Sequence, residues 1–150
     1  MEIPITKLRT VELFSGLTPE ELQAIVNVGE LTTYHQGDGI LDKGEKSTEV
    51  YVLLSGQVEV VSELSDQATS YVILGAGQSF GEMALLDAGP RSAAIRCVSE
   101  EAQILAMKRA MLLAFWKEHC DVGYKMMFNI ARDLAFKLRI RNLTQDMKGA

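Results

Sequence analysis

Hydrophobic and polar positions divide the chain into three parts that differ in spacing. In the first part, Thr18 is followed by Pro19 and Glu21, which together form the pattern of a capped helix start with a capping box. Apolar residues then follow at the spacing of one helix face, and Gly29 is a natural stop. The pattern therefore predicts an amino-terminal helix between Thr18 and Gly29.

The middle part, from about residue 30 to about residue 107, consists of short apolar runs separated by turn residues at intervals of roughly ten. The runs are rich in Val, Ile and Tyr, which favour a pleated and half-buried surface. They cover residues 49–54, 57–61, 69–74, 92–98 and 102–107. This rhythm predicts an antiparallel roll or sandwich.

The last part returns to helical spacing after Lys108. One helical stretch covers residues 109–120, and a second, without Gly or Pro, covers residues 124–148. As a continuous helix, this second stretch would extend about 37 Å, which is long for a chain of this size.

Two apolar faces lie almost opposite each other on the long helix, at about 100° per residue. One face consists of Met127, Ile130, Ala131, Leu134 and Leu138, and the other of Phe136, Ile140, Leu143 and Met147. The first face can pack on the domain that carries it. We expect the second to pair with the same face of another copy, which would make a homodimer. The alternative is that the last turns fold back or fray in solvent.

Composition and charge narrow the function classes. A chain of 150 residues that is 47% hydrophobic matches one domain over residues 1–150, with the β region at about 30–107 and the carboxy-terminal helices at 108–148. The formal net charge of −5 argues against nucleic-acid binding. The sequence has no signal-peptide core and no apolar stretch of about 18 residues. We therefore expect a cytoplasmic protein that does not bind membranes.

The candidate catalytic and metal-binding side chains are few and scattered. Cys97 and Cys120 form no CxxC pair, and His35 and His119 form no HxH pair. His119 is next to Cys120, but neighbouring residues on a helix point about 100° apart and no third orienting group is evident. We therefore expect no metal site, no catalytic residue and no enzyme activity.

Candidate binding chemistry gathers in residues 77–95. Phe80, Gly81 and Glu82 are expected to open a short helical turn whose backbone N–H groups are free to receive an anion. Gly81 has no side chain that would keep a ligand away from the backbone.

The end of the same segment supplies groups that suit a phosphate. Gly89 and Pro90 predict a rigid turn that delivers Arg91 and Ser92 into the next strand. Arg91 offers a planar fork of donors, and Ser92 offers a hydroxyl that can donate to the same group.

In order and spacing, FGEMALLDAGPRSA at residues 80–93 closely resembles the phosphate-binding cassette of the cyclic-nucleotide-binding domain family. This family includes the catabolite activator proteins and the protein kinase A regulatory subunits. LFSGLTPEEL at residues 13–22 resembles its amino-terminal helix, and VYVLLSGQVEVV at residues 50–61 resembles a strand, glycine turn and strand of the family. The resemblance implies a mainly β fold with flanking α-helices: an antiparallel double-stranded β-helix, or jelly-roll-like β-roll, with an amino-terminal helix and a long carboxy-terminal helix.

The resemblance also implies roles for the cassette residues. Glu82 would accept a hydrogen bond from the ribose 2′-hydroxyl, and Arg91 would pair with the cyclic phosphate. The implied ligand-binding set is Phe80, Gly81, Glu82, Met83, Ala84, Arg91, Ser92 and Ala93. The alternative is that Glu82 and Arg91 simply pair with each other.

Base recognition is assigned to the long helix by the same resemblance. Where the catabolite activators present a Thr and a Ser to the adenine, this chain has Lys137 and Leu138. Asn129 and Arg132 are the nearest polar candidates for base contacts, and the alternative is that both are solvated. We expect cAMP to be favoured over cGMP.

These observations together predict a regulatory or signalling sensor module that binds a cyclic nucleotide and needs no cofactor. The alternative is an interaction or dimerisation scaffold that carries the cassette without using a nucleotide. The sequence ends just after the long helix, where DNA-reading relatives append a helix-turn-helix domain, so we expect no DNA reading. The basic last helix leaves open an unidentified, acidic protein partner.

Overall fold

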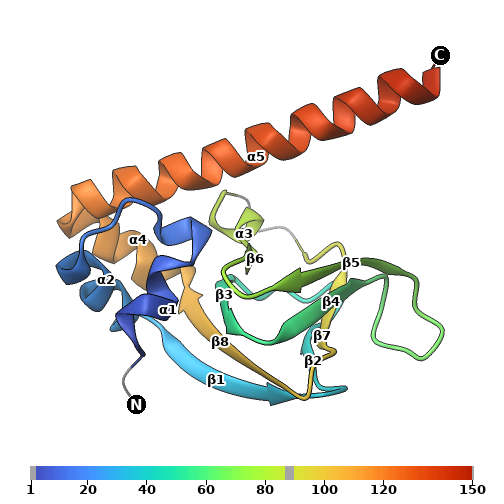
Figure 1. The fold of residues 1–150 in the computed structure, drawn as a ribbon, viewed down its shortest axis with the longest axis horizontal. Helices are drawn as coiled ribbons and strands as arrows, with labels where there is room; N and C mark the ends of the chain where they lie inside the picture. The colour runs from blue at the N-terminus through green and yellow to red at the C-terminus, as the bar shows by residue number, and fades with distance from the viewer. Residues whose placement is uncertain (1–2, 87–89, 150) are drawn as a thin grey trace.

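A β-roll with helices along one side forms the body of the molecule, and one long helix runs across it (Figure 1). This computed structural model describes residues 3–86 and 90–149, with the backbone alone at Met83 and residues 146–149. The strands are β1 (Glu30–His35), β2 (Gly39–Leu41), β3 (Glu49–Ser55), β4 (Gln57–Val61), β5 (Ser70–Gly75), β6 (Ser79–Phe80), β7 (Ala94–Cys97) and β8 (Glu101–Lys108). The helices are α1 (Ile5–Arg9), the 3₁₀ helix η1 (Glu12–Phe14), α2 (Pro19–Val26), α3 (Met83–Leu86), α4 (Arg109–Glu118) and α5 (Cys120–Gly149).

The strands form two four-stranded antiparallel sheets. Their orders are β1-β8-β3-β6 and β2-β7-β4-β5, so the chain passes repeatedly from one sheet to the other. The turn between β3 and β4 depends on Gly56, which has a φ of +87° and whose Cβ would collide with the carbonyl oxygen of Glu101. The predicted antiparallel β-roll, with helices on both sides of it in sequence, is confirmed.

Strand β3 is buried on both faces, which explains its unbroken apolar run. Val50, Val52 and Leu54 point into a core shared with the helices, whereas Tyr51 and Leu53 point into the core between the two sheets. The molecule therefore has three layers: helices, the β3 sheet, and the second sheet.

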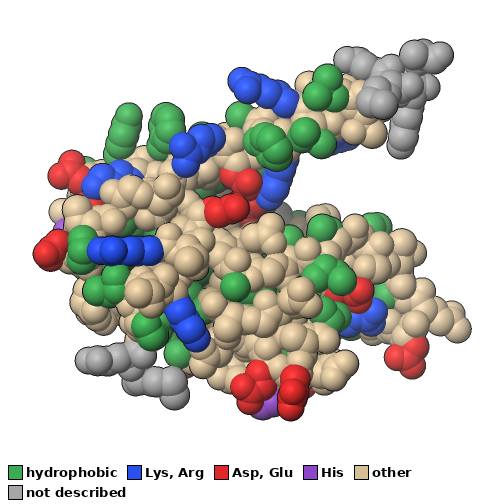
Figure 2. Space-filling view, in the orientation of Figure 1, with side chains coloured by type: hydrophobic (Ala, Val, Ile, Leu, Met, Phe, Trp, Pro, Cys, Tyr) green, Lys and Arg blue, Asp and Glu red, His purple; other side chains and the backbone are tan. Residues whose placement is uncertain are grey.

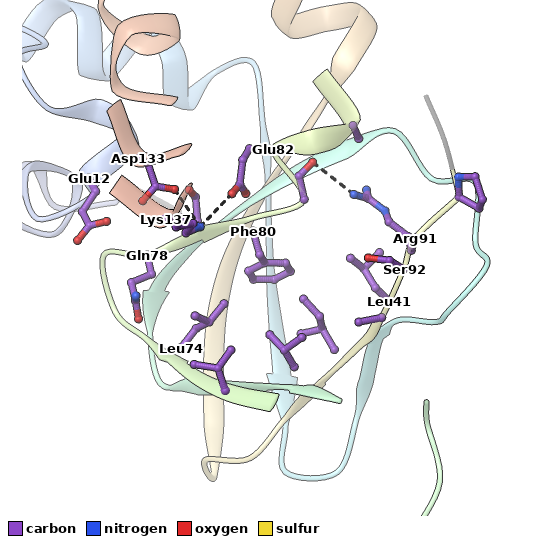
Figure 3. A pocket seen from close by; sticks show the side chains of 18 residues that line it. Glu12, Leu41, Leu74, Gln78, Phe80, Glu82, Arg91, Ser92, Asp133 and Lys137 are labelled. Carbon is purple, nitrogen blue, oxygen red and sulfur yellow. Dashed lines mark hydrogen bonds and ion pairs between the residues drawn. The ribbon is translucent and has the colours of Figure 1, made fainter. Parts of the chain in front are cut away.

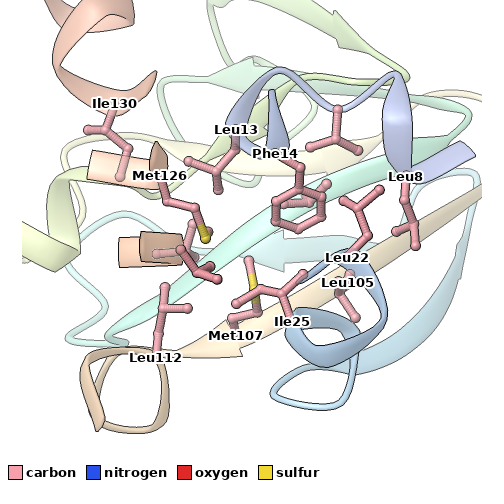
Figure 4. Close-up of a cluster of buried hydrophobic side chains, with 14 of the residues drawn as sticks. Leu8, Leu13, Phe14, Leu22, Ile25, Leu105, Met107, Leu112, Met126 and Ile130 are labelled. Atoms are coloured by element: carbon pink, nitrogen blue, oxygen red, sulfur yellow. The ribbon is translucent and has the colours of Figure 1, made fainter. Parts of the chain in front are cut away.

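The core under the helices joins the amino-terminal helices to α4 and α5. Leu8, Leu22 and Ile25 come from the amino-terminal side, and Leu112 and Met126 from α4 and α5 (Figure 4). Because the two ends of the chain share this core, the start of α5 is fixed to the body of the molecule.

Helix α2 has the predicted start. The side chain of Thr18 accepts a hydrogen bond from the backbone N–H of Glu21, and Glu21 Oε1 accepts one from the N–H of Thr18, so the capping box is complete. The helix ends at Val26, three residues before the predicted stop at Gly29.

Helix α5 begins four residues earlier than the sequence pattern indicates. It starts at Cys120 and includes Gly123, whose Cβ would lie 2.9 Å from Cβ of Trp116. Glycine is needed here because α4 and α5 approach each other too closely for a side chain. Val122 and Met126, which both precede the predicted face, are buried and pack in the core.

The face of α5 that packs on the body is therefore rotated relative to the predicted one. Ile130 is buried and Leu134 packs against the core, as predicted. Met127, Ala131 and Leu138 are exposed, which differs from the prediction. All the side chains described from Ala135 to Gln145 are exposed, because this part of α5 extends past the helices that cover its first half.

Candidate functional site

A cavity of about 690 Å³ lies between the second sheet, residues 78–84 and 90–93, and α5. Figure 2 shows the molecule hollowed beneath the distal half of α5. This volume is typical of a small-molecule site. The cavity is lined by Glu12, Leu41, Val60, Val72, Leu74, Gln78, Ser79, Phe80, Gly81, Glu82, Ala84, Pro90, Arg91, Ser92, Ala93, Ile95, Asp133 and Lys137.

Gly81 links the strand β6 to the short helix α3. Its φ is +80°, a conformation that L side chains rarely adopt. A Cβ at this position would lie 2.9 Å from the carbonyl oxygen of Glu49 and 3.0 Å from Nη1 of Arg91. The sequence suggested that this glycine makes room for a ligand, but the structure shows that it first makes room for Arg91.

Arg91 is positioned by main-chain acceptors. Nη2 donates to the carbonyl oxygen of Glu49 at 2.7 Å and to Ser47 Oγ at 3.3 Å, and Nη1 donates to the carbonyl oxygen of Gly81 at 3.3 Å. Nε is buried and has no hydrogen-bond partner among the described residues. The guanidinium is therefore held at the cavity wall (Figure 3), and no carboxylate of the described residues forms an ion pair with it.

Two aromatic rings support this part of the wall. Tyr51 and Phe80 stack with their ring centroids 5.0 Å apart and their planes at 12°. Burial raises the pKa of the Tyr51 hydroxyl, although a hydrogen bond with Ser47 acts in the opposite direction, so the phenol is neutral at neutral pH. The wall behind Arg91 is rigid and uncharged.

Glu82 is almost completely buried, with 7% of its surface exposed, and its nearest cation is Lys137 from α5. Lys137 Nζ lies 3.4 Å from Glu82 Oε1 and 2.9 Å from Asp133 Oδ2. The alternative that Glu82 pairs with Arg91 does not describe this structure, because Arg91 donates to the groups named above. The cavity thus presents a carboxylate acceptor and a separate guanidinium donor.

An apolar wall faces these charged groups. Val60 and Val72 are directly opposite each other on β4 and β5, and Leu74 follows on the same face of β5. Leu41 and Ile95 complete the wall. These residues could not be predicted from the sequence: the alternation within each strand is visible, but the face that meets the cavity depends on the pairing of distant strands.

Most of the predicted ligand-binding residues come together in the cavity lining. They are Phe80, Gly81, Glu82, Ala84, Arg91, Ser92 and Ala93. Met83 begins α3, and its side chain is not among those described. The predicted turn at Gly89 also lies outside the described residues.

The two predicted base contacts are not brought to the cavity. Asn129 is buried, and its Nδ2 donates to the carbonyl oxygens of Leu13 and Ser15, which fixes α5 to the amino-terminal segment. Arg132 is exposed, lies over the ring of Phe128 and donates to Asn129. From α5, the residues that line the cavity are instead Asp133 and Lys137.

The described part of the chain contains no group of three or more His, Cys, Asp or Glu side chains that could hold a metal ion. None of its helices is both long enough and apolar enough to cross a membrane.

The arrangement suits a small ligand that has an anionic group, a hydroxyl donor and an apolar part. Residues 31–119 match the family model of the cyclic nucleotide-binding domain, which covers more than half of the chain. The chain therefore belongs to the cyclic nucleotide-binding domain family.

Curated relatives from two classes are similar to the chain. It is 35% identical over 136 residues to the cyclic AMP receptor protein of Thermus thermophilus, covering 90% of this chain and 61% of that protein. It is 30% identical over 102 residues to a cGMP-dependent protein kinase of Eimeria tenella, covering 68% of this chain and 10% of the kinase. The chain thus spans about three fifths of the first relative and one tenth of the second.

Solved structures show the same fold. The catabolite activator protein of Thermus thermophilus superimposes with a TM-score of 0.78 at 34% identity, covering 91% of this chain and 62% of that one. The amino-terminal domain of a transcriptional regulator from Streptomyces coelicolor gives a TM-score of 0.75 at 24% identity, covering 89% and 93%. The regulatory domain of Toxoplasma gondii PKA, crystallised with cAMP, gives 0.62 at 23% identity, covering 76% and 46%.

Proposed function

We propose that this chain is a sensor module that binds a 3′,5′-cyclic nucleotide in the cavity between the cassette and α5, and that it is not itself an enzyme. The observation that carries the proposal is that one cavity presents two separate groups: the guanidinium of Arg91 and the buried carboxylate of Glu82. A cyclic phosphate carries one negative charge that suits a guanidinium, and a ribose hydroxyl donates to a carboxylate. A cyclic nucleotide satisfies both.

The purine occupies the apolar side of the cavity in this proposal. Val60, Val72 and Leu74 offer a surface for a planar ring, and Asp133 and Lys137 are the polar groups of α5 that lie at the cavity. Ser92 and Ala93 hold the phosphate together with Arg91. Asn129 and Arg132 are left out of the proposal because their contacts lie elsewhere.

We favour cAMP over cGMP as the ligand. The support is the higher sequence identity to the relative named a cyclic AMP receptor protein, which is 35% identical over 136 residues, whereas the cGMP-dependent kinase of Eimeria tenella is 30% identical over 102 residues. The module is proposed to act in the cytoplasm as a regulatory element.

A homodimer is part of the same proposal. Phe136, Ile140 and Leu143 are exposed apolar residues on the distal half of α5. Ile140 follows Asp133 by about two helical turns, so it lies on the same side of α5 as this cavity-lining residue. Pairing of two copies at this stripe would place the second chain beside the ligand cavity.

The test is a calorimetric titration of the purified chain with cAMP, cGMP, 5′-AMP and ATP, together with thermal melts. We expect cAMP to bind with micromolar or better affinity and to raise the melting temperature, because a ligand that binds only the native state stabilises it. Weaker binding of cGMP supports the stated preference. If neither cyclic nucleotide shifts the melt at millimolar concentration, the chain is instead a scaffold that carries the cassette without using it.

A further inference from the structure

Lys137 lies where a ligand hydroxyl would have to approach Glu82. Its Nζ is 3.4 Å from Glu82 Oε1 and 2.9 Å from Asp133 Oδ2, and Asp133 is one turn earlier on α5. All three residues line the same cavity (Figure 3). The contact between Lys137 and Glu82 joins α5 to the cassette, two segments that are 55 residues apart in the sequence.

The two oxygens of the Glu82 carboxylate have different surroundings. Oε2 is buried and has no hydrogen-bond partner among the described residues, whereas Oε1 faces Lys137. Because Oε2 is enclosed by protein atoms, a ligand hydroxyl in the cavity would reach the carboxylate at Oε1, where Lys137 already lies. A buried carboxylate oxygen without a donor also leaves Glu82 incompletely satisfied by Lys137 alone.

Lys137 has a second partner, Asp133, with which it can stay paired when it leaves Glu82. The 2.9 Å contact with Asp133 lies within α5 and does not involve the cassette. Burial by itself lowers the pKa of Lys137, but the hydrogen bond to Asp133 and the charge of Glu82 outweigh it and raise the pKa above its ordinary value. The side chain is therefore a cation at neutral pH with or without Glu82.

We propose that Lys137 is a specificity-determining residue that competes, as a tethered cation, with the ligand's hydroxyl for Glu82. This inference rests on the proposed function, because it assumes that a cyclic nucleotide enters the cavity. A ligand with a 2′-hydroxyl must break the contact between Lys137 and Glu82, so part of the gain from its hydrogen bond is lost. A 2′-deoxy ligand leaves that contact in place, so Lys137 weakens the discrimination between the two.

The experiment is a comparison of two ligands and two proteins by calorimetric titration of the full chain. The ligands are cAMP and 2′-deoxy-cAMP, and the proteins are the wild type and Lys137→Met, which keeps a long side chain and a good helix former. The Lys137 side chain is 57% exposed, so its pair with Glu82 is screened by solvent and the effect is small. We expect Lys137→Met to bind cAMP roughly two- to fivefold more tightly, and the ratio of the two dissociation constants to grow by a similar factor.

Three further variants separate competition from a general effect of charge. Lys125→Met removes another ion-paired lysine of α5, which contacts Glu21 outside the cavity lining, and should leave both affinities unchanged. Asp133→Asn removes the second partner of Lys137 and should weaken cAMP binding by about a factor of two. The double variant Lys137→Met/Asp133→Asn should behave like Lys137→Met alone.

The outcomes distinguish this inference from the function on which it rests. Weaker cAMP binding by Lys137→Met would mean that Lys137 contacts the ligand directly, and an unchanged ratio between the two ligands would mean that it does not compete for Glu82. Either result overturns the inference while leaving the proposed function intact. If the wild type binds no cyclic nucleotide at millimolar concentration, the proposed function fails and this inference fails with it.

Discussion

Arg91 is the residue whose surroundings are most completely defined at the cavity. Three of its hydrogen bonds go to Gly81, Glu49 and Ser47, and none of these acceptors carries a charge at the contacting atom. Among the described residues, its guanidinium is therefore held in place by uncharged acceptors. This combination of fixed position and available charge suits an anion that is itself small and rigid.

Replacing Arg91 tests whether its guanidinium binds the anionic group of the ligand. We expect Arg91→Ala to weaken cAMP binding by about 10- to 150-fold, because a hydrogen bond to a charged group is worth about 1.5 to 3 kcal/mol. The control is Lys125→Ala, which removes a cation of α5 that lies outside the cavity lining. Calorimetry measures both, and circular dichroism verifies folding. Equal losses in the two variants would mean that the anion binds elsewhere.

Gly81 carries a second prediction at this scale. Alanine at this position must adopt a left-handed backbone, which costs about 1 to 2 kcal/mol, and its Cβ must also displace Glu49 O or Arg91 Nη1. Gly37 has a similar φ of +91°, a Cβ there would meet nothing within 4 Å, and it lies outside the cavity lining, so Gly37→Ala reports the backbone strain alone. We expect Gly81→Ala to lose more stability in urea unfolding than Gly37→Ala and, unlike it, to weaken cAMP binding. Identical behaviour of the two would show that Gly81 does not position Arg91.

The sequence predicted those site residues that are close together along the chain. Residues 80–86 and 90–93 contribute groups to one wall, and their motif can be read without knowing the fold. On α5, the family resemblance indicated the position of Lys137, whereas Asp133 comes to the cavity through the rotation of the helix, which the sequence pattern did not predict. The start of α5 at Cys120 was not predicted because Gly123 follows it, and a glycine usually ends a helix rather than lying inside one.

At the scale of elements, the strands on apolar runs were predictable, whereas the largely polar six-residue strand β1 and the shortest strands were not. Strands β3, β4, β5, β7 and β8 lie on apolar runs that the pattern identified, and the capping box of α2 has its expected form. Strands β2 and β6, of three and two residues, are too short for any alternation to show. Such strands exist because neighbours in the sheet hold them, which is a property of tertiary structure.

Glu21 connects two elements and gives a prediction for pH. Its carboxylate accepts from the N–H of Thr18 in the capping box and pairs with Lys125 of α5 at 2.7 Å. The hydrogen bond with Lys125, followed by that with Thr18, lowers the pKa of Glu21 below its ordinary value of 4.5. Because the folded-state pKa is the lower one, the ionised carboxylate stabilises the fold above about pH 4.5, and this stabilisation is lost as the pH falls through the lowered pKa.

Glu21→Gln isolates the charge, since glutamine can still complete a capping box. We expect the variant to lose about 1 kcal/mol of unfolding free energy at pH 7, a modest value because the pair is partly exposed. The difference from the wild type should shrink as the pH is lowered from 5 to 3, roughly across the ordinary range of a glutamate. Urea unfolding at several pH values measures it. A difference that stays constant with pH would contradict the role given to the ion pair.

At the scale of the whole molecule, α5 exposes two apolar sets on opposite sides. Tyr124, Met127, Phe128 and Leu138 form one, and Phe136, Ile140 and Leu143 form the other. The sequence predicted that the domain would cover one whole apolar face of α5, but only Ile130 and Leu134 of that face pack on it. Val122 and Met126 supply packing through the early start of α5, and the side chains of residues 135–145 are exposed.

The proposed homodimer leads to a test at this scale. Replacing both Ile140 and Leu143 with Glu would place four like charges at a symmetric seam, two from each chain, and should give a folded monomer by sedimentation velocity. If assembly and ligand binding are coupled, the cAMP affinity should change as well, because each equilibrium biases the other by the same free energy. The matched control is Tyr124→Glu/Phe128→Glu on the opposite side. Loss of the dimer in the control alone would assign the seam to that side instead.

The junction of α4 and α5 gives the molecule a built-in optical probe. Trp116 is the chain's single tryptophan, it is buried, and its indole Nε1 donates to the sulfur of Met126 at 3.3 Å across that junction. Indole emission moves to longer wavelength when water reaches the ring, and thioether contact quenches it. Any movement that lifts the first turns of α5 off the body would therefore change both the colour and the brightness of the protein's own fluorescence. The packing of α5 on the body can therefore be followed in real time by tryptophan fluorescence of the unmodified chain, without a dye and without a substitution.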